Sequence, residues 1–168
     1  DWELIIIDDY SLDDTIQIVS SYLNLDERIK LIALPSNQGL SNARNTGIKI
    51  SRSKYLTFLD ADDQWHNRKL ESQIDLHNQN PTIRISHTNY DFIINDQRVA
   101  RNKIQYLDLI YAKSGNLFPQ ILYKNNLAIL SIMVEREVVL EAKGFDSSLW
   151  AFEDQDLWIK VAKQNLSF

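Results

Sequence analysis

A regular alternation of short apolar runs with longer helix-like segments limits the folds open to this chain. The apolar runs have the length of strands and occupy residues 3–7, 29–34 and 55–59. The segment 40–50, which follows a Pro-Ser-Asn-Gln-Gly turn, has helical spacing. Because parallel strands need a crossover connection that is usually helical, the alternation predicts an α/β fold with helices covering a parallel sheet.

The second half of the chain is less regular and predicts shorter elements. We expect helices at 68–77 and 137–143, strands at 83–86, 90–94 and 129–134, a polar loop at 95–102, and a final strand at 166–168. A last helix should begin near Asp154 and turn Leu157, Trp158 and Val161 inward. The 168 residues, 44% of them hydrophobic, suffice for one core, so we expect a single domain over 1–168.

The charge balance and the lack of cysteine exclude several classes of partner and site. A net charge of -5, with scattered lysines and arginines, leaves no basic surface for a nucleic acid. Without cysteine the chain has neither disulfides nor thiolate metal ligands, which suits a reducing cytoplasm. The chain opens on Asp1 rather than Met and enters a strand almost at once, so we expect it to be a piece of a longer protein.

Carboxylates follow two of the predicted strands. Asp8 and Asp9 come after the first strand, and Asp60, Asp62 and Asp63 come after the third. Ligands of open α/β sheets bind beyond the carboxyl ends of the strands, and Mg²⁺ or Mn²⁺ binds between carboxylate and phosphate oxygens. The spacing of Asp60 and Asp62 therefore predicts a divalent cation site. The alternative is a solvated turn whose aspartates cap the next helix.

Two further segments are candidate sites at helix starts. Residues 37–47 read Asn-Gln-Gly-Leu-Ser-Asn-Ala-Arg-Asn-Thr-Gly. Free N–H groups at a helix N-terminus attract phosphate, and Arg44 lies one turn further in. Glu153 and Asp154 stand among aromatic residues at the start of the last helix, and apolar neighbours raise the pKa of a carboxylate toward the range of a general base. For both segments an ordinary capped helix is the alternative.

Taken in order, five motifs resemble those of the family 2 glycosyltransferases with the GT-A fold. They are Asp8-Asp9-Tyr10-Ser11, the 37–47 segment, Phe-Leu-Asp-Ala-Asp-Asp at 58–63, Gly144-Phe145-Asp146 and Glu153-Asp154. The likeness covers nearly the whole chain, although Tyr10 stands where the family commonly has glycine. Family members normally begin with a further strand and helix, which we expect this chain to lack.

The resemblance implies a fold and a division of the chain. The fold would be a GT-A type, Rossmann-like three-layer α/β/α sandwich with a mostly parallel central sheet. Residues 1–65 would form the nucleotide-binding half and residues 66–168 the acceptor-binding half.

The resemblance also implies roles for individual residues. Asp9 would hydrogen-bond the nucleotide base, and Asp62 with Asp60 would hold Mn²⁺ or Mg²⁺ on the diphosphate. Asp154 would take the proton of the acceptor hydroxyl, and Glu153 would support it. The other nucleotide-binding residues would be Asp8, Arg44, Asn37, Gly39 and Asp60.

The implied reaction moves a sugar from a nucleotide donor, commonly a UDP-sugar, to a saccharide or lipid-linked acceptor. In a single displacement one group takes a proton, a divalent cation neutralises the leaving diphosphate, and the anomeric carbon inverts. The family implies bacterial cell-surface polysaccharide biosynthesis in the cytoplasm, with peripheral association of the full-length protein at the inner membrane.

Three other interpretations of the sequence stay open. A haloacid-dehalogenase-like phosphatase also has Asp-x-Asp after an apolar strand, but that family has Thr or Val where this chain has Gln64. A sugar-nucleotide pyrophosphorylase would need a glycine-rich loop with basic residues, which we do not find in the sequence. The non-enzyme alternative is a truncated, inactive nucleotide-binding relic.

Overall fold

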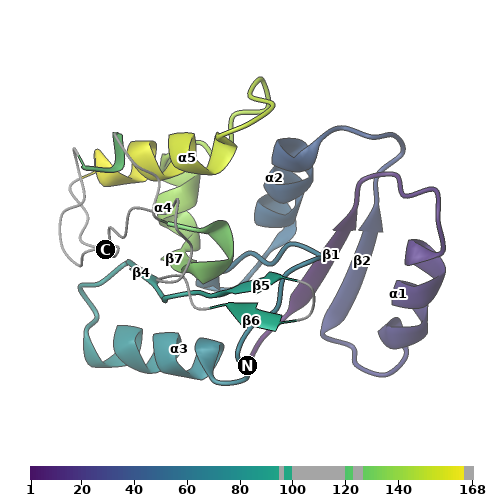
Figure 1. The fold of residues 1–168 in the computed structure, drawn as a ribbon, viewed down its shortest axis with the longest axis horizontal. Helices are drawn as coiled ribbons and strands as arrows, with labels where there is room; N and C mark the ends of the chain where they lie inside the picture. Colours follow the sequence, from purple (N-terminus) through teal and green to yellow (C-terminus); the bar gives the residue numbers. More distant parts are fainter. Residues whose placement is uncertain (95–96, 100–119, 123–126, 165–168) are drawn as a thin grey trace.

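The computed structural model describes residues 1–94, 97–99, 120–122 and 127–164 (Figure 1). Its first elements are β1 (Leu4–Asp8), α1 (Thr15–Leu23), β2 (Ile29–Ala33), α2 (Leu40–Ile50) and β3 (Tyr55–Leu56). They are followed by α3 (Lys69–Gln79), β4 (Ile85–His87), β5 (Phe92–Ile94) and β6 (Gln97–Val99). Short 3-10 turns at Gln120–Leu122 and Ile129–Ser131 precede β7 (Ile132–Glu135), α4 (Arg136–Glu141) and α5 (Glu153–Ala162). Within these ranges, no helix has both the length and the apolar character needed to cross a membrane.

The first elements form the predicted strand-helix-strand unit. β1 and β2 pair in parallel, with Leu4 opposite Ile29 and Asp8 opposite Ala33. α1 connects the two strands, and α2 packs against β1 (Figure 1). Because the strands are parallel, both carboxyl ends lie at one edge of the unit, and this edge carries Asp8 and Asp9.

A second sheet has the strand order β3-β7-β4, and β7 runs antiparallel to both neighbours. Parallel pairing is confined to β1 and β2 in the described part of the chain, whereas the sequence suggests a mostly parallel sheet. The β7 residues Ile132, Met133 and Val134 are all buried. A run that is apolar on both faces carries no signal of strand direction, so the sequence does not reveal this reversal.

The predicted boundaries of four helices agree with the structure, whereas the predicted end of the third strand does not. The helices expected at 40–50, 68–77, 137–143 and near Asp154 are confirmed to within two residues. β3 ends at Leu56 instead of 59. The next residue, Thr57, contacts the neighbouring strand through its side chain, because its hydroxyl donates to the carbonyl of Ile132 at 2.7 Å.

The prediction of a polar loop over 95–102 is wrong for Gln97–Val99, which form β6 and pair antiparallel with β5. β6 contains one apolar residue, Val99, so its sequence has no alternation that would indicate a strand. Residues 95, 96 and 100–102, and the strand expected at 166–168, lie outside the described residues.

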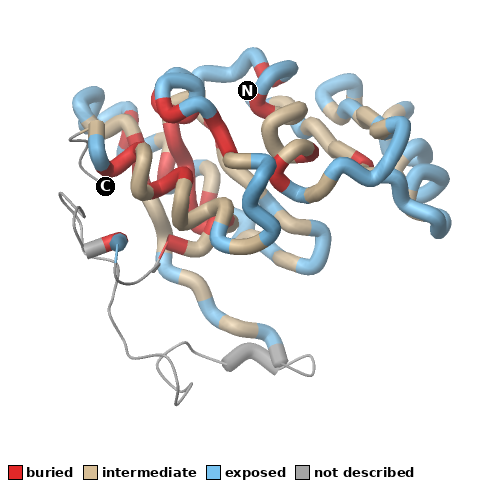
Figure 2. The backbone as a smooth tube through the Cα atoms, turned by 90° about the horizontal axis from the view of Figure 1, so that it is seen from above, coloured by how far each residue is buried: buried red, intermediate tan, exposed pale blue. Residues whose placement is uncertain are grey.

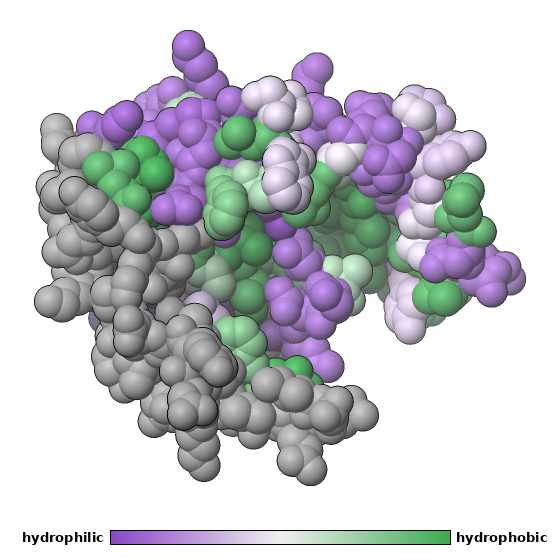
Figure 3. Space-filling model, turned by 45° about the horizontal axis from the view of Figure 1, so that its top comes forward, coloured by the Kyte–Doolittle hydropathy of each residue, from purple (hydrophilic) through white to green (hydrophobic). Residues whose placement is uncertain are grey.

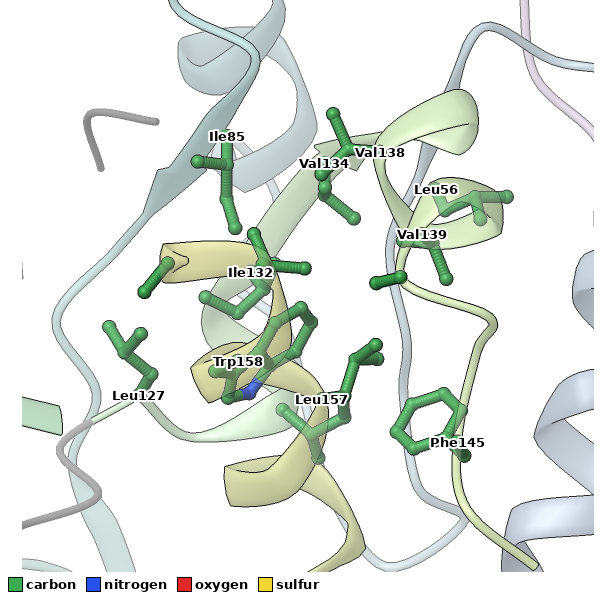
Figure 4. Close-up of a cluster of buried hydrophobic side chains, with 14 of the residues drawn as sticks. Leu56, Ile85, Leu127, Ile132, Val134, Val138, Val139, Phe145, Leu157 and Trp158 are labelled. Atoms are coloured by element: carbon green, nitrogen blue, oxygen red, sulfur yellow. The ribbon is translucent and has the colours of Figure 1, made fainter. Parts of the chain in front are cut away.

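The hydrophobic core lies among α4, α5 and β7 (Figure 4). Leu157, Trp158 and Val161 are fully buried, which confirms the predicted inward face of the last helix. Buried segments gather in this part of the molecule, whereas α1 has no buried residue (Figure 2). Because burying one large apolar side chain contributes about 1.5–3 kcal/mol, most of the stability of the fold resides in the core around Trp158.

One polar contact ties α2 to the turn after α4. The Asn45 side chain donates to the carbonyl of Phe145 at 2.8 Å and accepts from its N–H at 2.9 Å. The preceding Gly144 has a φ of +67°, where side chains are disfavoured. A Cβ on Gly144 would lie 2.5 Å from Oδ1 of Asn45. Both the backbone and the available space therefore require glycine at this position.

The two glycines nearest this contact should respond in opposite ways to alanine. Gly144→Ala should lower the free energy of unfolding by about 1–3 kcal/mol, because it adds strain and pushes Asn45 away. Gly47→Ala, where a Cβ would meet only Ile7 Cγ1 at 3.6 Å inside α2, should raise it by about 0.5–1 kcal/mol. Urea unfolding of the intact protein measures both changes. Equal changes of the same sign would contradict the close approach of Asn45.

Candidate functional site

Arg44 joins two of the acidic segments that are far apart in the sequence. Its Nη2 donates to Asp60 Oδ1 at 2.8 Å and Oδ2 at 3.0 Å, and its Nη1 donates to Glu153 Oε1 at 2.8 Å. The Arg44 side chain is only 8% exposed, so water screens these contacts weakly. The structure therefore brings the loop after β3 and the start of α5 together on one guanidinium.

Asp9 holds the loop that leads into α2. Its Oδ1 accepts from the N–H of Gln38 at 2.7 Å and its Oδ2 from the N–H of Gly39 at 2.8 Å. The Asn37 side chain donates to the carbonyl of Asp9 at 3.3 Å. Gly39 has φ +85° and ψ 158°, a backbone conformation that is essentially confined to glycine. These contacts give Asp9, Asn37 and Gly39 a structural function in shaping the helix start, in addition to any contact with a ligand.

Asp8 is buried with half of its carboxylate unpaired. It is 4% exposed, and its Oδ2 accepts from the N–H of Ser11 at 3.1 Å. Its Oδ1 has no hydrogen-bond partner among the described residues. A buried acceptor without a partner is unfavourable by about 1–3 kcal/mol, so a donor that reached Oδ1 would be stabilised there. Tyr10, two residues further on, has a φ of 69°, which explains why glycine is common at this position.

The loop after β3 concentrates negative charge. The N–H of Asp63 donates to the carbonyl of Asp60 at 3.0 Å, which closes a tight turn around Asp62. Burial, reinforced by the charges of Asp60 and Asp62, raises the pKa of Asp63. Asp62 is exposed, and no hydrogen bond or ion pair joins its carboxylate to the described residues. A cation at this loop would relieve the repulsion among the three carboxylates.

The donor set of this loop fits a cation that is shared with a ligand. In the described ranges, no three His, Cys, Asp or Glu side chains are arranged to enclose a metal ion. Mg²⁺ and similar ions need only one or two protein carboxylates when phosphate oxygens and water complete the coordination. Asp62 can supply one carboxylate directly, whereas Asp60 can supply another only by sharing it with Arg44.

The start of α5 places Asp154 beside Glu153 in the first turn of the helix. Asp154 Oδ1 accepts from the N–H of Gln155 at 2.7 Å. The loop before α5 projects from the molecule (Figure 1), and its aromatic residues Trp150 and Phe152 are 97% and 73% exposed. Because Glu153 shares Arg44 with Asp60, the turn that carries Asp154 lies on the same side of the molecule as the acidic loop.

Seen from the side of the loop before α5, the molecule is hollowed between α5 and the β1–β2 unit (Figure 3). The candidate residues come from three parts of the fold: Asp8 and Asp9 from the end of β1, Asp60 from the loop after β3, and Glu153 from the start of α5. Sequence reasoning identified these residues but missed the Arg44 bridge and the Asn45 contact. Their signal is weak, because a polar side chain on a helix is usually exposed.

Comparisons with known proteins agree with the resemblance that the motifs suggested. Residues 1–131 match the family model described as Glycosyl transferase family 2. An uncharacterized glycosyltransferase of Haemophilus influenzae is 37% identical over 142 residues, covering 82% of this chain and 52% of the relative. The Escherichia coli UDP-Glc:alpha-D-GlcNAc-diphosphoundecaprenol beta-1,3-glucosyltransferase WfgD is 30% identical over 164 residues, covering 98% of this chain and 59% of the relative. The chain thus spans just over half the length of each.

Solved structures confirm the predicted GT-A fold. S. aureus TarS in complex with UDP-GlcNAc has a TM-score of 0.69 at 20% identity, over 98% of this chain and 46% of TarS. The mannosyltransferase PcManGT from Pyrobaculum calidifontis, in complex with GDP-Man and Mn²⁺, has a TM-score of 0.69 at 20% identity, over 98% of this chain and 44% of PcManGT. At this identity the likeness is one of fold.

Removing Arg44 should destabilise the fold through the two carboxylates that it joins. Arg44→Met should lower the free energy of unfolding by about 3 kcal/mol, because Glu153 and Asp60 then lie close together without a counter-charge. The loss should be smaller in a Glu153→Gln background, by about 0.5–3 kcal/mol. Arg68→Met, which breaks only the exposed pair with Glu71, should change stability by less than about 1 kcal/mol. Urea unfolding of the wild type, the two single variants and the double variant measures the coupling, with Arg68→Met as the control, and strictly additive losses would contradict the bridge.

Proposed function

The chain belongs to glycosyl transferase family 2, and on that premise we propose that it is the catalytic core of an inverting sugar transferase. The observation that carries the proposal is the Arg44 bridge, which joins the acidic loop at Asp60 to the start of α5 at Glu153. The carboxylate that takes the acceptor proton and the carboxylate loop that binds the cation of the leaving diphosphate must lie on opposite sides of one anomeric carbon. The bridge supports that placement, and the activity, donor and acceptor of the whole protein are proposals built on it.

The proposed donor is a UDP-sugar. The name of WfgD contains UDP-Glc, and TarS was crystallised with UDP-GlcNAc. Uracil offers an N–H donor and ribose offers hydroxyl donors, and the buried Oδ1 of Asp8, which has no partner among the described residues, would accept from one of them. Asp9 would then act mainly by shaping the Asn37–Gly39 turn, although its carboxylate oxygens keep acceptor capacity for the base.

The proposed cofactor is Mn²⁺ or Mg²⁺, bound by Asp62 with Asp60 and by the donor diphosphate. The solved structure of PcManGT is a complex with GDP-Man and Mn²⁺. When bound, the cation would neutralise charge on the leaving diphosphate. Asp62 would orient the cation, and Arg44 would either share Asp60 with it or release Asp60 toward it. Chelation by EDTA should abolish transfer, and added Mn²⁺ should restore it.

The proposed base is Asp154, which would remove the proton of the acceptor hydroxyl during a single displacement. Glu153 would position it, because the bond to Arg44 holds the first turn of α5 against the acidic loop. With no protein nucleophile on the opposite face of the sugar, the anomeric configuration would invert. The acceptor would be a saccharide or lipid-linked saccharide of a bacterial cell-surface polysaccharide, and the division into a donor half at 1–65 and an acceptor half at 66–168 remains part of the proposal.

Two substitutions test the assignment of the cation ligand and the base. Asp62→Asn and Asp154→Asn in the intact protein should each lower kcat for sugar transfer by at least about 100-fold, because each removes a charge that the reaction needs. Asp75→Asn, on the exposed outer face of α3, should keep full activity. Transfer is measured with a panel of nucleotide-sugars, and UDP release alone measures hydrolysis. Near-full activity in both variants would refute the assignment, and an aspartyl-phosphate would indicate the phosphatase instead.

The exposed loop before α5 should contribute to acceptor binding. An aromatic ring exposed as fully as Trp150 offers a flat apolar face to the ring of a sugar. Trp150→Ala should raise KM for the acceptor by about two- to tenfold, which corresponds to 0.5–1.5 kcal/mol, and should leave KM for the donor unchanged. Trp2→Ala, at the start of the chain, is the matched control. A rise in KM for the donor alone would contradict a contact with the acceptor and would assign Trp150 to donor binding.

A further inference from the structure

The face of α3 that packs on the β3-β7-β4 sheet carries polar side chains where an apolar stripe would be expected. Lys69, Gln73 and His77 stand four residues apart and are 7%, 3% and 2% exposed. This spacing places them on one face of the helix. The glycosyl transfer proposed above uses none of the three.

A chain of hydrogen bonds runs along this face in one direction. Lys69 Nζ donates to Gln73 Oε1 at 2.7 Å, and Gln73 Nε2 donates to Ser86 Oγ at 3.1 Å. His77 Nδ1 lies 2.9 Å from the carbonyl of Ile83, which can only accept, so Nδ1 carries the proton. His77 Nε2 lies 3.0 Å from the Ser86 hydroxyl oxygen. The chain therefore begins at the Lys69 ammonium and ends at the His77 ring.

The ammonium of Lys69 also contacts the first residue of the segment between β3 and α3. It donates to the Thr57 hydroxyl at 3.1 Å, and that hydroxyl donates in turn to the carbonyl of Ile132 at 2.7 Å. Thr57 is the residue at which the β3 ladder stops, three residues before Asp60. Lys69 therefore fixes the point at which the chain leaves the sheet.

The same ammonium contacts the far end of that segment. It lies 4.5 Å from the ring centroid of Trp65, within the range of a cation–π contact. The indole N–H of Trp65 donates to the carbonyl of Leu130 at 2.9 Å. Thr57 and Trp65 bracket the residues that include Asp60, Asp62 and Asp63, so one buried cation contacts both ends of the acidic loop.

Burial makes this position unfavourable for the charge of a lysine. Burial alone lowers the pKa of the Lys69 ammonium to about 8. No carboxylate among the described residues lies within ion-pair distance of it, and the other titratable member of the network is His77, at the far end. A methionine would fill similar space without this desolvation. The contacts with Thr57 and Trp65 are what a methionine would not provide.

We propose that Lys69 is a positioning residue that holds both ends of the Thr57 to Trp65 segment and thereby orients Asp60 and Asp62 toward the donor diphosphate. The role of the two aspartates rests on the proposed function. The holding of the loop does not, because it follows from contacts within the chain. The two parts of the proposal can therefore be tested separately.

The first test measures cation binding. In the intact protein with UDP present, Lys69→Met should weaken Mn²⁺ binding about 10- to 100-fold by calorimetry, as loss of an outer-sphere contact typically does. Thr57→Val should act in the same direction, and Thr57→Ser, which keeps the hydroxyl, should bind Mn²⁺ as the wild type does. His77→Leu is the matched control, because it breaks the same buried network away from the loop. Equal weakening in Lys69→Met and His77→Leu would overturn the proposal, since it would indicate a merely structural effect.

The second test does not depend on any activity. Because the pKa of Lys69 is about 8, the indole N–H resonance of Trp65 should shift with a midpoint near pH 8 in the wild type and in His77→Leu, and should not shift in Lys69→Met. A resonance that is insensitive to pH in the wild type, or that titrates equally in Lys69→Met, would overturn the loop contact. If the wild type binds neither UDP nor Mn²⁺ while the resonance behaves as expected, the proposed function fails and the holding of the loop stands.

Discussion

The arrangement of the candidate site depends on one nearly buried guanidinium. Arg44 is in the second turn of α2, yet the carboxylates that it binds come from the loop after β3 and from the start of α5. A buried arginine requires paired carboxylates, and carboxylates in a shared pocket require a counter-charge, so none of the three groups is stable there alone. This mutual requirement holds the loop after β3 against the start of α5. Asp9 holds the turn before α2, and Asn45 ties the middle of α2 to the turn after α4, so both contacts help to place Arg44.

The sequence predicts the elements of the fold well where periodicity and turn residues agree. The helix Leu40–Ile50 is bounded by Gly39 on one side, and the last helix carries a clear apolar stripe, so both are predicted nearly to the residue. The antiparallel direction of β7 is not readable, because its residues are apolar on both faces. The strand β6 is missed for the opposite reason, since it has almost no apolar residues.

The candidate site is predicted residue by residue only where a motif carries a chemical signature. Asp60, Asp62, Glu153 and Asp154 follow from carboxylates at the ends of elements, and the fold brings their segments together. The partners of these residues are a different matter. The sequence does not tell whether Arg44 contacts a nucleotide or two carboxylates. Nor does it tell whether Asp9 contacts a base or the N–H groups of Gln38 and Gly39, because both depend on distances in the folded chain. The same is true of Lys69, whose charge suggests a surface residue until the packing of α3 is known.

The one-way order of hydrogen bonds along α3 has a consequence for how this helix can change during evolution. Lys69, Gln73, Ser86 and His77 are joined by consecutive hydrogen bonds. Replacing one of the inner members therefore leaves buried polar groups on both sides of it without a hydrogen-bond partner. Replacing α3 by an ordinary amphipathic helix would require simultaneous changes at Thr57, Gln73 and Ser86. We therefore expect that grafting α3 between relatives succeeds only when its partners Thr57 and Ser86 are transferred with it.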